Sequence, residues 1–564
     1  MRYLYTVVLL LACCIANCYG QTNAYNYKSV KQIRVKNGAV VSAHPLASAA
    51  GAEILKKGGN AVDAAIATQL ALAVVYPNAG NLGGGGFMVL HSSKGEQVTY
   101  DYREMAPGRA SRDMFIDTAG NADTSLSQSG HLASGVPGTV AGLFLSHKEH
   151  GRLPMAALID PAIKLAEKGF VITGKEAAGL NALRDDFLKF NRVKPAFVKD
   201  GSWKAGDTLF QPHLAHTLQL IKEKGAAGFY EGETAQKIVD EMQHGKGIIT
   251  LDDLKQYKAI KRSPVTFDYK GYKIVTMPLP SSGGIMLQQM LGILERYPLD
   301  KYGFDSPEAM QLMIEVERRV YADRAAFMGD PGFVKVPVTA LTSPAYLAQR
   351  MSDYKPGKAS ESKNIHHGSP QQEHEETTHL SVVDNQGNAV AVTTTLNGSY
   401  GSRVVVGNAG FILNNEMDDF SAKPGVPNMY GLLGSEANAI APYKRMLSSM
   451  TPTIVLHNGL PYLVAGTPGG STIITSVLQT LVNVIDFGLS IHDAVNLPKF
   501  HHQWQPDLVY VEKGFSAETL YKLRGMGYHI YNRNGIGRTE VIRIKDGIIE
   551  AVADGRGEDS AAGY

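Results

Sequence analysis

Residues 355–376 constrain the fold more than any other part of the chain, because a strongly polar segment ends there at a pair of threonines. The stretch KPGKASESKNIHHGSPQQEHEE has almost no apolar side chain, so it cannot form a core element and is predicted to be an exposed, mobile tether. Thr377 and Thr378 follow directly, and the next residues have the pattern of a buried strand. A change from exposed to buried chain over so few residues suits a cleavage site.

Cleavage before Thr377 would give that residue a free α-amine beside its own hydroxyl. An α-amine has an ordinary pKa of about 7.7 to 8.0, so it can accept the hydroxyl proton near neutral pH. An N-terminal threonine is therefore a nucleophile that carries its own base. The alternative is that Thr377 is an ordinary β-branched residue opening a strand, and the tether alone favours that alternative.

Residues 1–20 have the layout of a secretory signal peptide: Arg2, an apolar run and then small residues. The run is shorter than the ~20 apolar residues of a membrane span, so we expect export to the periplasm or beyond. The sequence Leu-Leu-Ala-Cys ending at Cys13 leaves a lipoprotein anchor as a minor alternative. The chain has 3 cysteines, all in this segment, so the mature protein is expected to have no disulfide.

The charge balance argues against a nucleic acid or an anionic membrane as the main partner. Lys and Arg number 55 against 53 Asp and Glu, a net charge of +2. Hydrophobic residues at 44% and charged residues at 19% are typical of a globular protein, and 564 residues allow one or two structural units. A small molecule is the favoured partner.

The hydrophobic pattern predicts layers of helices and strands. An Ala-rich helix is expected over 46–59, and Asn60 can cap a second helix over 61–75 that is apolar on nearly every side and so belongs in an interior layer. Helical patterns dominate from 155 to 354. Strands are expected at 87–91, 98–102, 379–383, 389–395, 453–456 and 462–465. The fold class is α/β, with helices covering sheets.

Several segments resemble the γ-glutamyltranspeptidase family, also called glutathione hydrolases, motif for motif and in order. In the C-terminal part these are TTHLSVVD from Thr377, GNAVAVTTTLN from Gly387, LNNEMDDFS from Leu413, LSSMTPT from Leu447 and GTPGGS from Gly466. In the N-terminal part they are SAHP from Ser42, GGNAVDAA from Gly58, GGGGF from Gly83 and YREMAP from Tyr102. Several long motifs in order are far more specific than any one of them.

The resemblance implies an N-terminal-nucleophile hydrolase, an αββα sandwich made of two autoprocessed subunits. The large subunit would comprise residues 21–376 and the small catalytic subunit residues 377–564, held together as a heterodimer. In this interpretation the hydroxyl of Thr377 attacks the carbonyl of Glu376, and hydrolysis of the resulting ester frees the amine. Glu376 departs from the uncharged amide residue that some relatives carry there, which bears on the rate of self-cleavage.

The resemblance also assigns the catalytic groups. Thr395 matches the threonine that hydrogen-bonds and orients the nucleophile's hydroxyl, although such a residue could also be an ordinary strand threonine. Gly469 and Gly470 match the backbone amides that hold the oxyanion of the tetrahedral intermediate. Glycine suits that role because the backbone must approach the reacting carbon with no Cβ in the way. The resemblance implies neither a metal nor a cofactor.

A γ-glutamyl group ends in an α-carboxylate and an α-ammonium, so its pocket must offer both charges. The resemblance implies that the carboxylate binds Arg103, Ser448 and Ser449, and that the ammonium binds Asp419, Asn397 and Glu416. The alternative for Arg103 is a surface salt bridge with Glu104. An unpartnered buried carboxylate is costly, so Asp419 should be most stable with the substrate's cation beside it. Asp418 is expected to be structural.

A loop, a run of glycines and three histidines each have a functional and a purely structural interpretation. Residues 421–434 resemble the lid loop of bacterial family members, with Tyr430 at the position of the lid tyrosine, although a plain surface loop is the alternative. Gly83 to Gly86 lack the residues of a phosphate-binding loop and are predicted to pack tightly under the site. His366, His367 and His374 lack regular metal-ligand spacing and are predicted to be solvated.

The sequence therefore predicts an acyl transferase and hydrolase. It would take the γ-glutamyl group of glutathione or a related amide and pass it to water, an amino acid or a dipeptide. The nearest rival is a cephalosporin acylase of the same fold, whose glutaryl substrate lacks the ammonium, and Asp419 argues against it. A secreted binding protein without chemistry is a rival of another class.

Overall fold

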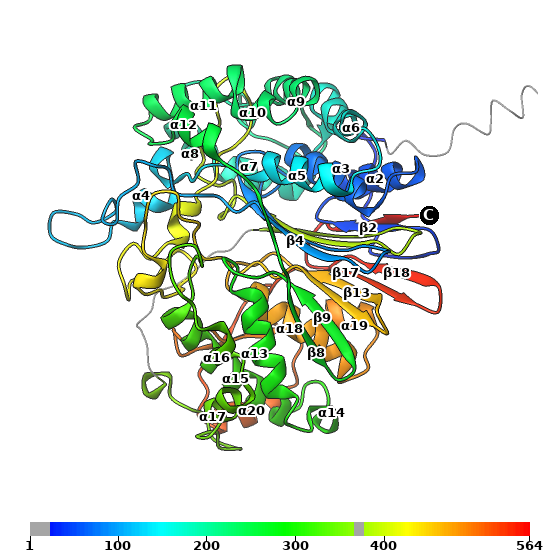
Figure 1. Ribbon diagram of the computed structural model, residues 1–564, viewed down its shortest axis with the longest axis vertical. Helices are drawn as coiled ribbons and strands as arrows, with labels where there is room; N and C mark the ends of the chain where they lie inside the picture. Colours follow the sequence, from blue (N-terminus) through cyan, green and yellow to red (C-terminus); the bar gives the residue numbers. More distant parts are fainter. Residues whose placement is uncertain (1–22, 366–376) are drawn as a thin grey trace, which may run out of the picture.

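The computed structural model describes residues 23–365 and 377–564. Its centre is a pair of seven-stranded antiparallel sheets stacked face to face, with helices on both outer sides (Figure 1). In spatial order, the first sheet contains β19 (Ser560–Gly563), β2 (Ala39–Ser42), β10 (Thr378–Val383), β11 (Ala389–Thr395), β3 (Gly85–His91), β4 (Gln97–Asp101) and β7 (Ile260–Arg262). The second contains β1 (Gln32–Val35), β18 (Ile548–Val552), β17 (Glu540–Lys545), β13 (Leu460–Gly466), β12 (Thr453–His457), β9 (Tyr272–Thr276) and β8 (Val265–Tyr269).

Two helical layers complete the αββα order predicted from the sequence. Above the first sheet in Figure 1 lie α2 (Pro45–Lys56), α3 (Ala61–Val75), α5 (Thr139–His150), α6 (Met155–Lys168), α7 (Gly174–Ala182), α8 (Arg184–Phe190), α9 (Pro212–Lys224), α10 (Ala227–Tyr230), α11 (Gly232–His244) and α12 (Leu251–Gln256). Below the second lie α13 (Gly283–Leu294), α14 (Leu299–Tyr302), α15 (Pro307–Phe327), α16 (Val338–Leu341), α17 (Pro344–Arg350), α18 (Thr472–Ile485), α19 (Ile491–Asn496) and α20 (Ala517–Gly525).

Short elements fill the connections. They are α4 (Thr124–Gln128), the small strands β5 (Phe170–Val171), β6 (Thr208–Leu209), β14 (Phe500–His501), β15 (Val509–Val511) and β16 (Ile530–Asn532), and four 3₁₀ turns at His131–Ala133, Ser362–Asn364, Glu416–Asp419 and Glu436–Asn438. The third of these turns carries two of the acids that the sequence assigns to the substrate pocket.

Helix α3 is buried along its whole length, as its uniformly apolar sequence predicts. It begins with the expected cap: the Asn60 side chain accepts from the backbone of Asp63, and the Asp63 side chain accepts from the backbone of Asn60. Asp384, in the turn between β10 and β11, also accepts from the Ala61 N–H at 2.9 Å. The central hairpin is thus fastened to the start of the helix that covers it.

Side-chain alternation divides the core into layers. Leu380 and Val382 of β10 pack toward the first helical layer, whereas Ala389 and Ala391 of β11 pack between the two sheets. In the expected hairpin, Val383 pairs with Ala389 at the turn. Thr378, the first residue of β10, pairs with Thr394 at the open end. Thr377 directly precedes β10, so this register fixes its position beside the end of β11.

One hairpin within the region assigned to helices escaped the sequence analysis. Strands β8 and β9 pair through a tight turn at Lys270 and Gly271, both with positive φ. The alternating sequence VTFDYKGYKIVT carries the signal for this hairpin, which lies at the edge of the second sheet.

The prediction of an exposed tether holds for residues 355–358, 361, 363 and 364, but it is wrong at two positions. Ser362 and Ile365 are buried, and the indole N–H of Trp504 donates to the carbonyl of Ile365 at 2.6 Å. Asp507 accepts from the backbone N–H of Ser362 at 2.7 Å. Polar residues can be buried here because side chains from distant segments satisfy the backbone, which a local composition argument cannot anticipate.

Several predictions fall on residues 1–22 and 366–376, outside the described part of the chain. These are the signal peptide, the lipoprotein alternative at Cys13, the histidines at 366, 367 and 374, and Glu376. Among residues 23–365 and 377–564, no helix is long and apolar enough to cross a membrane. The same residues contain no group of three or more His, Cys, Asp or Glu that could hold a metal ion.

Candidate active site

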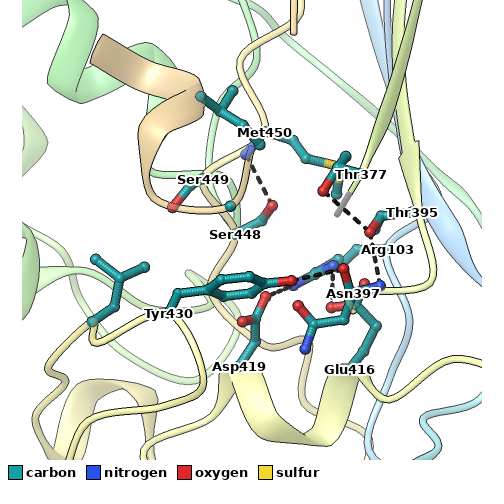
Figure 2. A pocket seen from close by; sticks show the side chains of 13 residues that line it. Arg103, Thr377, Thr395, Asn397, Glu416, Asp419, Tyr430, Ser448, Ser449 and Met450 are labelled. Atoms are coloured by element: carbon teal, nitrogen blue, oxygen red, sulfur yellow. Dashed lines mark hydrogen bonds and ion pairs between the residues drawn. The ribbon is translucent and has the colours of Figure 1, made fainter. Parts of the chain in front are cut away.

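A cavity lies at the edge where strand ends from both sheets meet (Figure 2). The antiparallel pairing places the start of β10 next to the end of β11, and the end of β4 lies at the same edge of the sheet. In the second sheet, the start of β12 lies next to the end of β13. Residues flanking those ends line the cavity: Arg103, Thr377, Thr395, Asn397, Glu416, Asp419, Tyr430, Leu432, Ser448, Ser449, Met450, Gly470 and Ile473. The structure therefore brings together the predicted site residues among those described, apart from Gly469, which is not among these lining residues.

Thr377 faces Thr395 across the open end of the hairpin. Thr377 is 4% exposed, and its hydroxyl oxygen lies 3.5 Å from that of Thr395. The Thr395 oxygen also accepts the backbone N–H of Asn397 at 2.8 Å. That bond fixes the Thr395 side chain and leaves its hydroxyl proton and a further lone pair for the neighbouring threonine.

Gly469 and Gly470 form the turn between β13 and α18, and both have positive φ, of 133° and 48°. A Cβ at Gly470 would come within 2.6 Å of the Tyr430 ring. The carbonyl of Gly469 accepts the backbone N–H and the hydroxyl of Thr472, each at 2.8 Å. Backbone conformation and the close approach of Tyr430 both require glycine at position 470.

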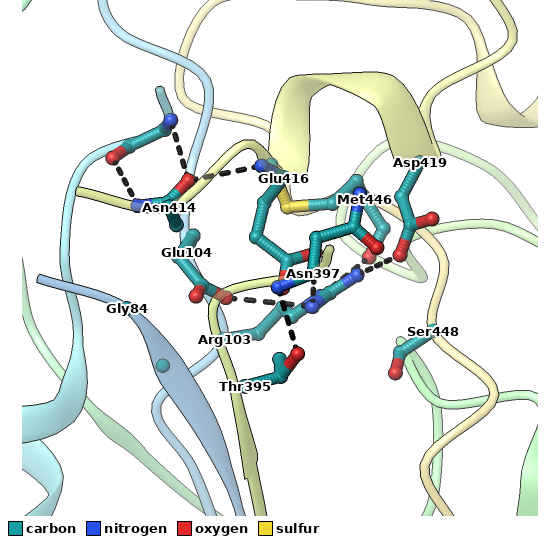
Figure 3. A network of polar contacts seen from close by, with 12 residues as sticks. Gly84, Arg103, Glu104, Thr395, Asn397, Asn414, Glu416, Asp419, Met446 and Ser448 are labelled. Carbon is teal, nitrogen blue, oxygen red and sulfur yellow. Dashed lines mark hydrogen bonds and ion pairs between the residues drawn. The ribbon is translucent and has the colours of Figure 1, made fainter. Parts of the chain in front are cut away.

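Arg103 lies at the centre of a cluster of acids and is 1% exposed, so the surface salt bridge is excluded (Figure 3). One terminal nitrogen is bonded to Asp419, and the other lies 2.6 Å from a Glu416 carboxylate oxygen. Glu104 approaches the same nitrogen at 3.4 Å. The Arg103 pKa is raised, because the Glu416 and Asp419 carboxylates outweigh the effect of burial.

One guanidinium cannot balance three ionised carboxylates in a buried site. Burial raises the Glu104 pKa to about 7, against the attraction of Arg103. Burial also raises the pKa of Glu416 well above its ordinary value, and the Glu104 charge adds to that effect. Neither oxygen of Glu416 accepts a well-formed hydrogen bond in the described chain, so the approach of Arg103 at 2.6 Å is the contact that offsets the burial of this carboxyl.

Asp419 is neither fully buried nor unpartnered, contrary to the sequence analysis. Its side chain is 12% exposed and bonded to Arg103. Asn428 of the lid segment also donates to it at 3.0 Å. Asp418 points elsewhere, accepting from the Ser127 hydroxyl at 2.5 Å and the Met429 N–H at 2.8 Å, which agrees with a structural role.

The hydroxyl oxygens of Ser448 and Ser449 both accept hydrogen bonds from groups of the protein. The Ser448 oxygen accepts the backbone N–H of Met450 at 3.1 Å, and the Ser449 oxygen accepts from the Arg324 guanidinium at 3.3 Å. Neither hydroxyl donates to another group of the described chain. Both protons are therefore available to an acceptor in the cavity, as binding of a carboxylate requires.

Tyr430, in the segment that the resemblance assigns to a lid, lines the cavity and is buried. Its hydroxyl donates to the carbonyl of Asn397 at 2.7 Å, and its own carbonyl accepts from the side chain of Gln503 at 3.1 Å. Asn428 ties the same segment to Asp419. These contacts hold the segment against the cavity.

Comparison with known proteins identifies the family. A family profile described as gamma-glutamyltranspeptidase matches residues 47–564. The chain belongs to that family. Among curated members, the glutathione hydrolase proenzyme of Escherichia coli (strain K12) is 50% identical over 537 residues, which cover 94% of this chain and 93% of the relative.

Solved structures agree with this assignment. The cephalosporin acylase of Bacillus halodurans superposes with a TM-score of 0.84 at 26% identity, covering 97% of this chain and 99% of that one. A chain of the γ-glutamyltranspeptidase of Helicobacter pylori matches with a TM-score of 0.57 at 44% identity, covering 60% of this chain and 96% of that one. The N-terminal-nucleophile hydrolase fold implied by the resemblance is confirmed.

The sequence analysis did not identify two residues that lie outside the cavity and hydrogen-bond the residues lining it. Arg324 of α15 bonds Ser449, and Gln503 bonds the lid. Glu104 follows Arg103 in a quoted motif, yet its part in the acid cluster was not anticipated. The packing assigned to Gly83–Gly86 is confirmed, since a Cβ at Gly84 would lie 2.1 Å from the Thr395 carbonyl.

Proposed function

We propose that this chain is a γ-glutamyl hydrolase and transferase that frees its own nucleophile by cleavage before Thr377. One observation carries the proposal: the hydroxyl of Thr377 opens into a cavity that holds a guanidinium and a carboxylate, Arg103 and Asp419, side by side. An α-amino acid head group carries the complementary pair of charges. The substrate class is glutathione and related γ-glutamyl amides.

Self-cleavage follows from the chemistry of the same hydroxyl. The Thr377 oxygen attacks the carbonyl of Glu376, the peptide bond breaks as the new α-amine takes a proton, and water hydrolyses the ester. The products are a large subunit ending at Glu376 and a small subunit beginning at Thr377, which stay paired. Strands β2 and β3 flank the β10–β11 hairpin in one sheet, so cleavage leaves the sheet's hydrogen bonds intact.

Each later turnover uses the freed amine. It accepts the Thr377 hydroxyl proton as the oxygen attacks the γ-carbonyl, and it returns the proton to the leaving amine. The Gly469–Gly470 turn supports the oxyanion. The resulting γ-glutamyl ester is then attacked by water, giving glutamate, or by the amino group of an amino acid or dipeptide, giving a new γ-glutamyl amide.

Asp419 favours this function over glutaryl acylation. A glutaryl group has the carboxylate but no ammonium, so Asp419 would meet no cation from such a substrate. The pair of Arg103 and Asp419 matches a zwitterion, because each charge can exchange its partner for the substrate's opposite charge. We also propose that the protein is exported, on the basis of its N-terminal sequence.

Replacing the nucleophile tests the proposal. Thr377→Ala should run as one band on a denaturing gel and release no amine from glutathione, whereas the unaltered protein should run as two bands. Thr378→Ala is the matched control, because that hydroxyl is buried with no partner in the described chain. It should be cleaved and active. A cleaved, active Thr377→Ala protein would refute the proposal, and an uncleaved, inactive unaltered protein would favour a binding function.

A further inference from the structure

Helix α15 carries buried arginines along its length, and they differ in how their charge is balanced. Arg319 is bonded to Glu315 at 2.5 Å and Asp353 at 2.7 Å, and Arg318 is paired with Asp507. Arg324 is only 5% exposed, yet it forms no ion pair with a carboxylate in the part of the chain that the structure describes. Asp419 attracts it only from beyond contact distance, so no carboxylate of the described residues touches this buried cation.

The hydrogen bonds of Arg324 lead directly to the cavity. Its Nε donates to the Ser282 hydroxyl at 3.0 Å, and that hydroxyl donates to the Ser448 carbonyl at 2.7 Å. Its Nη2 donates to the Ser449 hydroxyl oxygen at 3.3 Å. One route ends at the backbone of Ser448 and the other at the hydroxyl of Ser449, and both serines line the cavity.

These bonds determine what Ser449 can offer a ligand. Because its oxygen already accepts from a charged donor, its own proton is free to be donated, and the donor's charge strengthens that bond. An acceptor in the cavity is therefore preferred over a donor. The positive charge behind the hydroxyl makes an anionic acceptor the best match.

Burial of an unpaired cation is costly, so its retention calls for an anion that arrives from outside. Burial lowers the Arg324 pKa, in accord with such a cost. Arg103 supplies the other cation at this end of the cavity, but its charge is shared among Glu104, Glu416 and Asp419. A carboxylate bound between Arg103 and the serines would thus depend on a second positive charge.

We propose that Arg324 is a positioning residue that makes the Ser448–Ser449 end of the cavity selective for the substrate's α-carboxylate. It acts through Ser449, which it turns into a hydrogen-bond donor, and through its uncompensated charge. This inference rests on the proposed γ-glutamyl activity and assigns one end of that substrate to a residue outside the cavity wall.

Three chromogenic amides of p-nitroaniline separate the ends of the substrate. The γ-glutamyl amide has both charged groups, the 4-aminobutanoyl amide lacks the carboxylate, and the glutaryl amide lacks the ammonium. In Arg324→Met, kcat/KM for the γ-glutamyl and glutaryl amides should fall about 10-fold or more, whereas the 4-aminobutanoyl amide should change by less than about 3-fold. Arg324→Lys should recover part of the loss by restoring the charge.

Arg319→Met is the matched control on the same helix. It removes a buried arginine that has acidic partners, so it should lower the unfolding temperature without changing the ratios among the three amides. Equal loss for all three amides in Arg324→Met would overturn the inference, because a purely structural role predicts it. An unaltered protein that released no p-nitroaniline from the γ-glutamyl amide would instead count against the proposed function itself.

Discussion

Arg103 and Asp419 are bonded directly to each other, although we assign them to opposite ends of the substrate's head group (Figure 3). Each residue serves as the counter-charge of the other in this state. A zwitterion entering the cavity would place its carboxylate near the arginine and its ammonium near the aspartate. Binding then replaces the Arg103–Asp419 ion pair by two ion pairs with the substrate. Both protein charges have a partner before and after binding.

Asp419→Asn should weaken γ-glutamyl binding and favour glutaryl substrates. Without the carboxylate, the substrate's ammonium loses its partner while Arg103 becomes more available to a lone carboxylate. We expect kcat/KM for a γ-glutamyl amide to fall about 100-fold, and that for a glutaryl amide to rise or stay level. Asp418→Asn makes the same chemical change at a residue that does not line the cavity and should leave the ratio unchanged. Equal ratios in both variants would place the ammonium contact elsewhere.

Asp418 should give a distinct pH signature in stability. Burial raises its pKa in the folded protein to about 7, from an ordinary value of 3.8. A raised carboxyl pKa favours the folded state at low pH, and the benefit is lost as pH rises toward the folded pKa. The free energy of unfolding of the unaltered protein minus that of Asp418→Asn should therefore fall by about 2 to 3 kcal/mol from pH 5 to pH 7. It should be flat above pH 8, and denaturant titrations at fixed pH measure it. A difference independent of pH would show that Asp418 does not titrate in this range.

Local sequence signals predicted the elements that depend on local physics. Asn60 and Asp63 cap α3 through contacts three residues apart, and the Asn458–Gly459 turn joins β12 to β13 through two positive φ angles. The sequence predicts the Asn60 cap, and both features depend on residues that are close together in the chain. Ser362 was misread, because its burial depends on Arg318 and Asp507, which are distant in the chain.

The candidate site also combines features that the sequence predicts with features that depend on contacts between distant residues. The resemblance named most of the residues that line the cavity, though not Leu432, Met450 or Ile473. It also could not show that Arg103 and Asp419 pair with each other, or that Glu104 joins them. Arg324 lies on a helix whose sequence shows only a mixture of charges. Its lack of an acidic partner is a property of the packed structure, and no spacing in the sequence indicates it.

Thr395→Val should slow the chemical step while leaving substrate binding nearly intact. Valine keeps the β-branched shape and removes the hydroxyl that holds Thr377 and accepts from Asn397. We expect kcat to fall about 10- to 100-fold with little change in KM. Thr395→Ser retains the hydroxyl and should keep most of the activity. Loss of activity in the serine variant equal to that in the valine variant would indicate that shape, and not the hydroxyl, is required.

Trp504 should affect self-cleavage more than turnover. Its indole N–H donates to the carbonyls of Ser362 at 3.2 Å and Ile365 at 2.6 Å, which precede the nucleophile in the sequence. Trp504→Phe removes both bonds, so the chain entering the cleavage site is held less firmly, and we expect the precursor band to disappear about 10-fold more slowly on a gel time course. Once cleaved, the variant should have unaltered kcat/KM, since Trp504 does not line the cavity. Trp203→Phe is the control, because it removes a comparable indole bond, to Phe197 at 2.7 Å, in the large subunit. Equal processing rates in the two variants would show that the fastening at Ile365 has no part in cleavage.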